Sequence, residues 1–184
     1  MSALSLDDAK AHLDITTSTN DAELQDFIDA AEGALGKRVG PLTPASISTR
    51  VEGYGWGLHL PVRPAISLTS VAVANSSTTL DLTTLYLDTN SGTVSMSDGS
   101  FFTSWAYDVA WQAGWQTVPP DLLHAVKEFV RHLWETQRGA PNRTIGSALV
   151  ETIAPTLPVA AFTFPIRVEE LLAPYEAIQY GLGA

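Results

Sequence analysis

Three side chains that can bind metals recur at helical spacing in the second half of the sequence. His124, Glu128 and His132 occupy positions i, i+4 and i+8 of an expected helix, so two imidazoles and a carboxylate share one side of it. Each step of four residues, however, turns about 40° around the helix axis, and zinc usually draws its ligands from more than one element. We therefore interpret these residues as a polar, solvated flank of the helix, and we expect no metal and no other cofactor.

Other patterns that could support catalysis are incomplete. The alternating glycines of GYGWG, residues 53–57, lead into a strand-like run and not into a helix N-terminus, so we expect a turn between strands and not a phosphate site. No Gly-x-Ser-x-Gly motif occurs, and Ser147 has no evident His and Asp partners. A hydrolase would therefore lack an identifiable nucleophile and base, and we expect the protein not to be an enzyme.

Five tryptophans offer a different chemistry, because indole rings stack on sugars and on bases. Trp111 and Trp134 fall within strand-like and helix-like patterns, where packing in the core is the simpler interpretation. Trp115 would be the residue that holds a glycan, and a tryptophan-bearing carbohydrate-binding module remains an alternative function. The full set is Trp56, Trp105, Trp111, Trp115 and Trp134.

The composition is that of a globular chain. The sequence has 184 residues, 45% of them hydrophobic, which is enough for one domain with a sizeable core. It contains no cysteine, which excludes disulfides and thiolate metal sites. Neither a signal peptide nor a run of about 20 apolar residues is visible, so we expect a soluble protein.

The net charge of −10 is concentrated near the N-terminus. Residues 1–36 hold eight acids and one base, Lys10. Such a surface repels a phosphate backbone and disfavours ordinary nucleic-acid binding. It is either a solvated helix face that aids solubility or a wall along which a polyanion slides without sticking. Asp26, Asp29 and Glu32 are the candidate residues for that acidic surface.

Apolar residues recur with helical spacing in four segments. Ser5 is the expected N-cap of the first segment, Gly36 and Gly40 with Pro41 are expected to end the second, and Pro174 cuts the last. The segments are residues 6–13, 20–35, 121–138 and 167–173.

A different periodicity fills the region between residues 46 and 112. Six short runs rich in Val, Thr, Leu and aromatic residues are separated by turn signals, which predicts a small antiparallel sheet or barrel. LYLDTNSGTVSM, residues 85–96, is the clearest hairpin. Between residues 65 and 106 the only charged residues are Asp81, Asp88 and Asp98. Uncharged polar strands often pack on a neighbouring chain, although a free-standing β region is equally consistent.

The pattern as a whole predicts a single α+β domain. We expect a small helical bundle of two N-terminal helices, one long helix and one short C-terminal helix, with an inserted antiparallel β region. The expected parts are the N-terminal helices (1–40), the β insert (46–116), the long helix (119–139), an extended loop (140–166), and the C-terminal helix and tail (167–184).

The block YDVAWQAGWQTVPPDLLHAVKEFV links the last expected strand to the long helix. Gly114 lets the chain turn between Trp111 and Trp115. Pro119 cannot continue a strand ladder, and Pro120 suits the first turn of a helix. We expect these residues to form a structural joint that pins the β region to the helical bundle.

Five blocks occur in a fixed order over residues 4–175. They are LSLDDAKAHLDI with NDAELQDFIDAAEGAL, LHLPVRPAISLTSVAV, LYLDTNSGTVSM, YDVAWQAGWQTVPPDLLHAVKEFVRHLWETQRG, and IRVEELLAPY. In this order they resemble the head–tail connector family of long-tailed bacteriophages, also called adaptor or head-completion proteins, and its relatives in gene transfer agents. The segment before the last helix and the residues after Tyr175 depart from the family pattern.

The resemblance implies a structural protein of the virion neck, made in the cytoplasm of the host bacterium. Members of this family form a ring, usually of twelve copies, which lies under the portal, extends the DNA channel and offers a docking platform to neck or tail-completion proteins. The implied partners are copies of the same chain, the portal protein and a neck or tail protein. Double-stranded DNA passes through without specific binding. Candidate partner contacts are Tyr175, Ile178, Tyr180 and Leu182.

Overall fold

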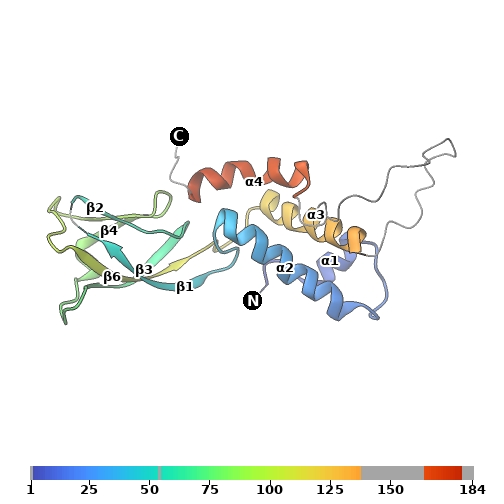
Figure 1. Ribbon diagram of the computed structural model, residues 1–184, viewed down its shortest axis with the longest axis horizontal. Coiled ribbons are helices and arrows are strands. Elements are labelled where there is room, and N and C mark those ends of the chain that lie inside the picture. The colour runs from blue at the N-terminus through green and yellow to red at the C-terminus, as the bar shows by residue number, and fades with distance from the viewer. Residues whose placement is uncertain (1, 54, 138–163, 180–184) are drawn as a thin grey trace, which may run out of the picture. The chain divides into compact units, whose positions relative to one another are not determined.

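The computed structural model describes residues 2–53, 55–137 and 164–179 (Figure 1). These residues form four α-helices and two antiparallel sheets, which confirms the predicted α+β class. None of the described helices combines the length and the hydropathy that crossing a bilayer requires. Most of the expected loop over 140–166 lies outside the described residues.

The chain divides into two compact units. Among the described residues, the strand unit contains residues 33–53, 55–119 and 172–179, and the helix unit contains residues 2–32, 120–137 and 164–171. Two helices contribute residues to both units, because the boundaries fall within them.

The first helix, α1 (Leu6–His12), begins as the capping box predicts. The backbone N–H of Asp8 donates to Ser5 Oγ over 3.1 Å, which satisfies one of the N–H groups that lack a partner in the first helical turn. The helix buries Ala9 and packs against α3 (Pro120–Gln137).

The second helix, α2 (Asp21–Val39), is longer than the sequence predicts. Gly36 does not end it, because the apolar period continues through the buried side chains of Leu35 and Val39. The helix ends at Gly40, whose φ of 81° is readily adopted only by glycine. Of the two glycines expected to end the helix, Gly40 is confirmed, whereas the end near Leu35 and Gly36 is wrong. Burial outweighs the weak helix propensity of an internal glycine, which costs about 1 kcal/mol.

The long helix α3 matches its prediction to within one residue at each end and begins at Pro120. Its apolar face forms the middle of the helix unit, where Trp134 packs edge to face against Phe27 of α2. The buried residues of α3 are Leu122, Ala125, Val126, Phe129, Val130 and Leu133.

The last helix, α4 (Ile166–Gln179), continues through Pro174, so the predicted stop at this proline is wrong. Proline removes one backbone hydrogen bond and costs about 3 kcal/mol in a helix interior. Val168 and Leu172 are fully buried before the proline, and Glu176 forms an ion pair with Arg38 of α2 after it. These contacts on both sides offset the local cost.

The strand unit contains two three-stranded antiparallel sheets, and all six predicted strands are present. In the first sheet the central strand β6 (Ala106–Ala113) pairs with β1 (Ala45–Glu52) and with β3 (Ala65–Val73). In the second sheet β5 (Thr93–Met96) lies between β2 (Gly57–His59) and β4 (Leu85–Asp88).

The predicted hairpin over residues 85–96 is confirmed as β4 and β5. Asp88 organises its turn, because its Oδ1 accepts hydrogen bonds from the backbone N–H groups of Asn90 and Ser91 at 3.0 and 3.3 Å. Gly92 then adopts a φ of 62°, and its N–H donates to the carbonyl of Asp88. The side chain thus takes the hydrogen bonds that the turn leaves open.

Both sheets share one hydrophobic core. Alternate residues of β6 face it, as its burial pattern shows, and Trp111 is the largest fully buried side chain. The indole N–H of Trp111 donates to the carbonyl of Val62 over 3.3 Å, so the one polar atom of this ring is satisfied. Packing in the core, as the strand pattern predicts, is confirmed for this tryptophan.

Candidate functional surfaces

The histidines singled out in the sequence do not form one cluster. His124 and His12 each place Nε2 3.7 Å from Oε1 of Glu128, whereas His132 stacks on Phe129. His12 comes from α1, and the sequence pattern missed it because the spacing of one helix cannot reveal a ligand from another. The side chain of Glu128 is only 19% exposed, so this flank is more buried than predicted. Among the residues that the structure describes, no three His, Cys, Asp or Glu groups could hold a metal ion.

The surroundings of His12 change its titration. Burial lowers its pKa below the ordinary value of 6.5, and the positive charges of Lys127 and Arg131 act in the same direction. The carboxylate of Glu128 opposes the shift but does not overcome the burial. The imidazole is therefore held neutral at pH 7, and its Nε2 is a buried atom without a hydrogen-bond partner.

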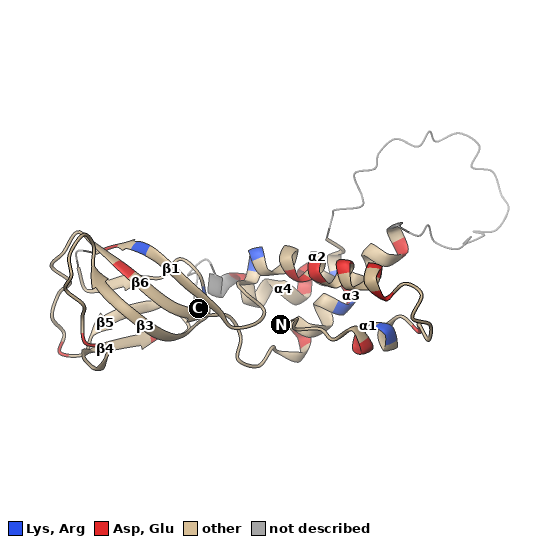
Figure 2. Ribbon diagram, turned by 90° about the horizontal axis from the view of Figure 1, so that it is seen from below, with Lys and Arg blue, Asp and Glu red and all other residues tan. Residues whose placement is uncertain are grey.

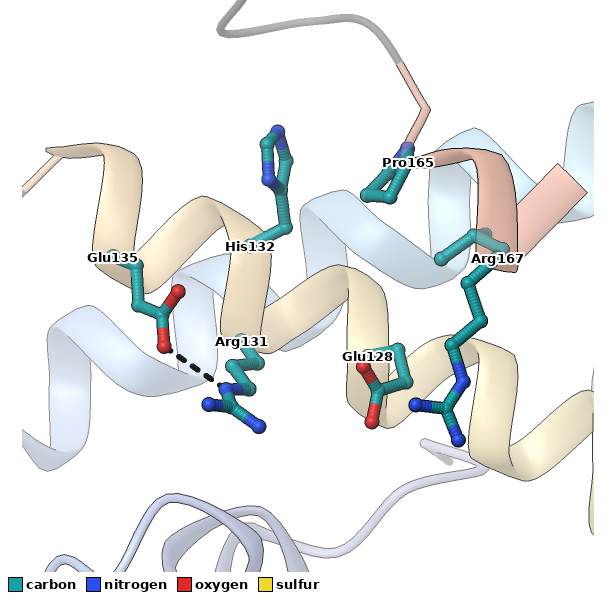
Figure 3. Close-up of a pocket in the computed structure, with 7 residues that line it drawn as sticks. Glu128, Arg131, His132, Glu135, Pro165 and Arg167 are labelled. Carbon is teal, nitrogen blue, oxygen red and sulfur yellow. Dashed lines mark hydrogen bonds and ion pairs between the residues drawn. The ribbon is translucent and has the colours of Figure 1, made fainter.

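A small pocket of about 210 Å³ lies between α3 and the start of α4 in the helix unit (Figure 3). Arg131 Nε donates to Glu135 Oε1 over 2.9 Å, and the imidazole of His132 points away from this pair. Arg167 Nη2 lies 3.3 Å from His124 Nε2. The charges of the pocket are largely balanced, and the described residues that line it include no Ser, Thr or Cys that could act as a nucleophile.

The acidic residues of the helix unit have two different environments. Asp26 and Asp29 are exposed on α2, and Figure 2 marks several Asp and Glu positions in red along this helix. Glu32 is half-buried, and its Oε1 accepts hydrogen bonds from Ser2 Oγ and from the N–H groups of Ala3 and Leu4 at 2.6 to 2.9 Å. Its carboxylate anchors the N-terminal segment to α2. Sequence spacing could not show this, because the partners are one hydroxyl and two backbone N–H groups about 30 residues away.

The predicted joint residues lie at the end of β6 and in the connection to α3. Gly114 has a φ of 115°, and a Cβ there would lie 2.6 Å from the carbonyl oxygen of Thr43. The position therefore requires glycine. Trp115 packs edge to face on Tyr175 with ring centroids 5.3 Å apart, so its ring is not a free platform for a glycan. Pro119 precedes α3.

The candidate partner contacts at the C-terminus fall only partly within the described chain. Tyr175 is half-buried against Trp115. Ile178 belongs to α4, and Tyr180 and Leu182 lie outside the described residues.

The strand unit exposes an aromatic surface that the sequence did not single out. Trp56 is 65% exposed and Phe101 is 51% exposed, and their ring centroids are 3.9 Å apart. Beside them are two hollows that share Gly55: one of about 420 Å³, which Phe101 and Phe102 line, and one of about 620 Å³, which Trp56 lines. We call this surface the aromatic groove. The only signal for it in the sequence was Trp56 within the glycine-rich turn.

Backbone pairing holds the groove in place. Gly55 and Phe102 form an isolated antiparallel bridge, in which each donates its N–H to the carbonyl of the other. Phe102 is buried and packs edge to face on Tyr107 of β6. The two segments that carry Trp56 and Phe101 are thus tied to the core of the strand unit, which fixes both rings on the surface.

Comparison with known proteins gives matches only among solved structures. No family model matches the sequence, and no curated protein matches it. A chain in the neck of an empty gene transfer agent (GTA) particle computed with C6 symmetry is similar, with a TM-score of 0.63 and 20% identity, over 94% of this chain and 89% of that one.

Two further structures give the same result. A chain in the virion of a native GTA particle has the same TM-score, identity and coverage. A chain in the neck of a native GTA particle computed with C12 symmetry has a TM-score of 0.60 at 20% identity, over 92% of this chain and 88% of that one. At this identity the similarity establishes a shared fold over nearly the full length.

Proposed function

We propose that this protein is a structural component of the neck of a phage-like particle and acts as its head-to-tail connector. The observation that carries the proposal is the fold match, which spans 94% of the chain and involves chains of GTA necks and virions. The order of the five sequence blocks supports the same role independently. Under this proposal the protein is not an enzyme and needs no cofactor.

The proposed assembly is a ring of twelve copies under the portal. Two of the similar structures were computed with C6 and C12 symmetry, which fits a cyclic arrangement. A closed ring of identical chains joins two different surfaces on each subunit. The ring would extend the DNA channel and offer a docking platform to neck or tail proteins. In the assembled subunit, the helices would form the bundle into which the β region is inserted.

The acidic surface is the proposed wall of the channel. Asp26 and Asp29 are exposed on α2, and carboxylates at a channel wall would repel the phosphates of passing DNA. Each phosphate that a protein neutralises adds salt-dependent affinity, and such affinity would hinder movement of the DNA. Double-stranded DNA would then pass without specific binding.

A charge-reversal variant tests the acidic wall. Asp26→Lys combined with Asp29→Lys should impair retention or ejection of DNA in assembled particles. Glu32 is left unchanged, because reversing it would also remove the anchor of the N-terminal segment. Normal infectivity of the double variant would place these acids away from the channel.

The C-terminal tail is the proposed contact to the portal or tail. A truncation that tests it should begin at residue 177, because Tyr175 packs on Trp115 and Glu176 pairs with Arg38. We expect the shortened protein to fold but to attach less firmly to its neighbours. Unchanged attachment would contradict a role for Ile178, Tyr180 and Leu182.

Purified particles provide the direct test of the proposal. Mass spectrometry should detect the protein in the virion, and a cryo-EM map of the neck should contain a ring of density that fits the described chain. Absence of the protein from the particle would contradict the proposed function.

A further inference from the structure

We propose that the aromatic groove binds the proline-containing segment of a second copy of this chain, residues 153–159 (IAPTLPV). The inference rests on the proposed ring, in which each subunit touches two identical neighbours. The segment lies outside the described residues, and its sequence and the chemistry of the groove carry the assignment.

The groove has the properties of a surface that binds proline-rich peptides. Such peptides adopt a polyproline II helix and dock on grooves lined by aromatic rings. Trp56 and Phe101 present two adjoining exposed rings, and the hollows of about 420 and 620 Å³ beside them give room for several side chains. Among the described residues that line the groove, Glu52 is the only carboxylate, so the surface suits an uncharged ligand.

The segment has the matching pattern. Pro155 and Pro158 are three residues apart, and a polyproline II helix has three residues per turn with a rise of about 3.1 Å each. In such a helix the pyrrolidine rings of Pro155 and Pro158 would lie on the same side, about 9 Å apart. Residues 152–164 carry no charged side chain. Proline also loses little conformational freedom on binding, so an uncharged segment can dock at a low entropic cost.

The demands of a ring favour a second copy as the source. A heterologous interface joins two different patches, one from each neighbour. The groove belongs to the strand unit, whereas the segment precedes Phe164 in the sequence, and Phe164 stacks on Phe129 in the helix unit. One chain thus carries both halves of a repeating contact. Trp56 and Phe101, which would be exposed in an isolated subunit, would be covered in the ring.

A peptide titration tests the recognition. A fluorescently labelled peptide of residues 150–162 is added to the full chain carrying Pro155→Ala and Pro158→Ala, so that its own segment does not compete. We expect saturable binding measured by anisotropy, and a loss of affinity of about tenfold or more when Trp56→Ala is added. Tyr86→Ala is the matched control, because Tyr86 is 63% exposed and does not line the groove.

Two further controls separate recognition from non-specific adhesion. The same peptide with both prolines replaced by alanine should not bind. Circular dichroism should show that Trp56→Ala leaves the fold intact. Equal binding to the Trp56→Ala variant, or no binding by the intact peptide, would overturn the inference. Neither result would bear on whether the protein is present in the virion.

A crosslinking experiment tests the second copy as the source. A photoreactive amino acid replaces Phe101 in a chain with one affinity tag, and this chain is assembled into particles together with a chain that has a different tag. We expect crosslinks from position 101 to residues 153–159 of the differently tagged chain. Crosslinks that occur only within one chain, or only to another virion protein, would overturn the assignment.

Discussion

The helix unit and the strand unit expose opposite kinds of side chain. On α2 the exposed groups include the carboxylates of Asp26 and Asp29, whereas the strand unit exposes Trp56, Phe101 and Trp105 (Figure 2 shows the charges). Exposed carboxylates are well hydrated and repel polyanions. Clustered exposed aromatic rings are poorly hydrated and mark surfaces that become covered. The acidic surface of α2 is suited to repelling a polyanion, and the aromatic surface of the strand unit is suited to binding a partner.

Within each unit, residues of the same chemical class also differ in whether they pack in the fold or are exposed. Trp111 is fully buried and Trp105 is 77% exposed, although both belong to the strand unit. Glu32 anchors the N-terminal segment, whereas Asp26 is exposed on the same helix. Residue type therefore does not decide whether a side chain stabilises the fold or remains available for contact.

Substituting the buried and the exposed tryptophan should give the largest difference in the free energy of unfolding. Trp111→Ala removes the largest side chain of the core and should lower the free energy of unfolding by about 3–5 kcal/mol. Urea denaturation followed by circular dichroism measures it. Trp105→Ala is the control and should change stability by less than about 0.5 kcal/mol, because its ring is exposed. Equal effects of the two substitutions would refute the distinction.

Glu32 and Asp26 should differ in the helix unit. Glu32→Ala removes the acceptor of three hydrogen bonds to the N-terminal segment and should cost about 1.5–3 kcal/mol. Amide hydrogen exchange at Ala3 and Leu4 should accelerate at the same time. Asp26→Ala should have little effect on either measurement. If exchange at Ala3 stays slow in the Glu32 variant, another group holds the segment.

Gly114 and Gly33 should respond with opposite signs. Gly114→Ala forces a Cβ to within 2.6 Å of a backbone oxygen at a φ of 115°, and should destabilise the strand unit by about 1–3 kcal/mol. Gly33→Ala places a methyl group in open space on α2 and should stabilise the protein by about 0.5–1 kcal/mol. Thermal unfolding of the two variants gives the comparison. A stabilising Gly114→Ala would show that the turn can relax.

The smallest expected change in stability comes from lowering the pH, and it should differ between the helix unit and the strand unit. Burial keeps the pKa of His12 below 6.5, so the folded state binds fewer protons than the unfolded state below that pH. Stability should therefore fall as the pH drops below 6.5, by at most about 1.4 kcal/mol per pH unit for one proton. Chemical denaturation between pH 7 and 5 measures it, and His12→Gln should flatten the dependence. An unchanged slope in the variant would assign the effect to another group.

The strand unit should respond only in stronger acid. Hydrogen bonds from neighbouring Ser and Thr residues and from backbone N–H groups lower the pKa values of Asp81, Asp88 and Asp98 below their ordinary value of 3.8. A lowered carboxyl pKa stabilises the fold above that pH, and the contribution is lost as the pH falls below it. Signals from the strand unit should therefore stay constant between pH 7 and 5.

The sequence alone predicted all six strands, the hairpin at residues 85–96 and the start of α1, because turn chemistry and capping act over a few neighbouring residues. It also predicted Trp111 in the core from the alternation of one strand. The predicted helix stops at Gly36 in α2 and at Pro174 in α4 were wrong, whereas the one at Gly40 was correct. Gly36 and Pro174 disfavour helix locally, but buried side chains on the same helices favour its continuation. The balance between local helix propensity and side-chain burial depends on tertiary packing, which cannot be read from a short stretch of sequence.

Only the tertiary structure decided which groups meet across distant segments. It brought His12 to Glu128, the N-terminal backbone to Glu32, and Trp56 to Phe101, over separations of 28 to 116 residues. Side-chain chemistry and periodicity are encoded locally, and therefore the sequence determined the α+β class and the acidic character of α2. The whole fold decides which surface is free to bind a partner, because a side chain stays exposed only where no other segment of the chain packs on it.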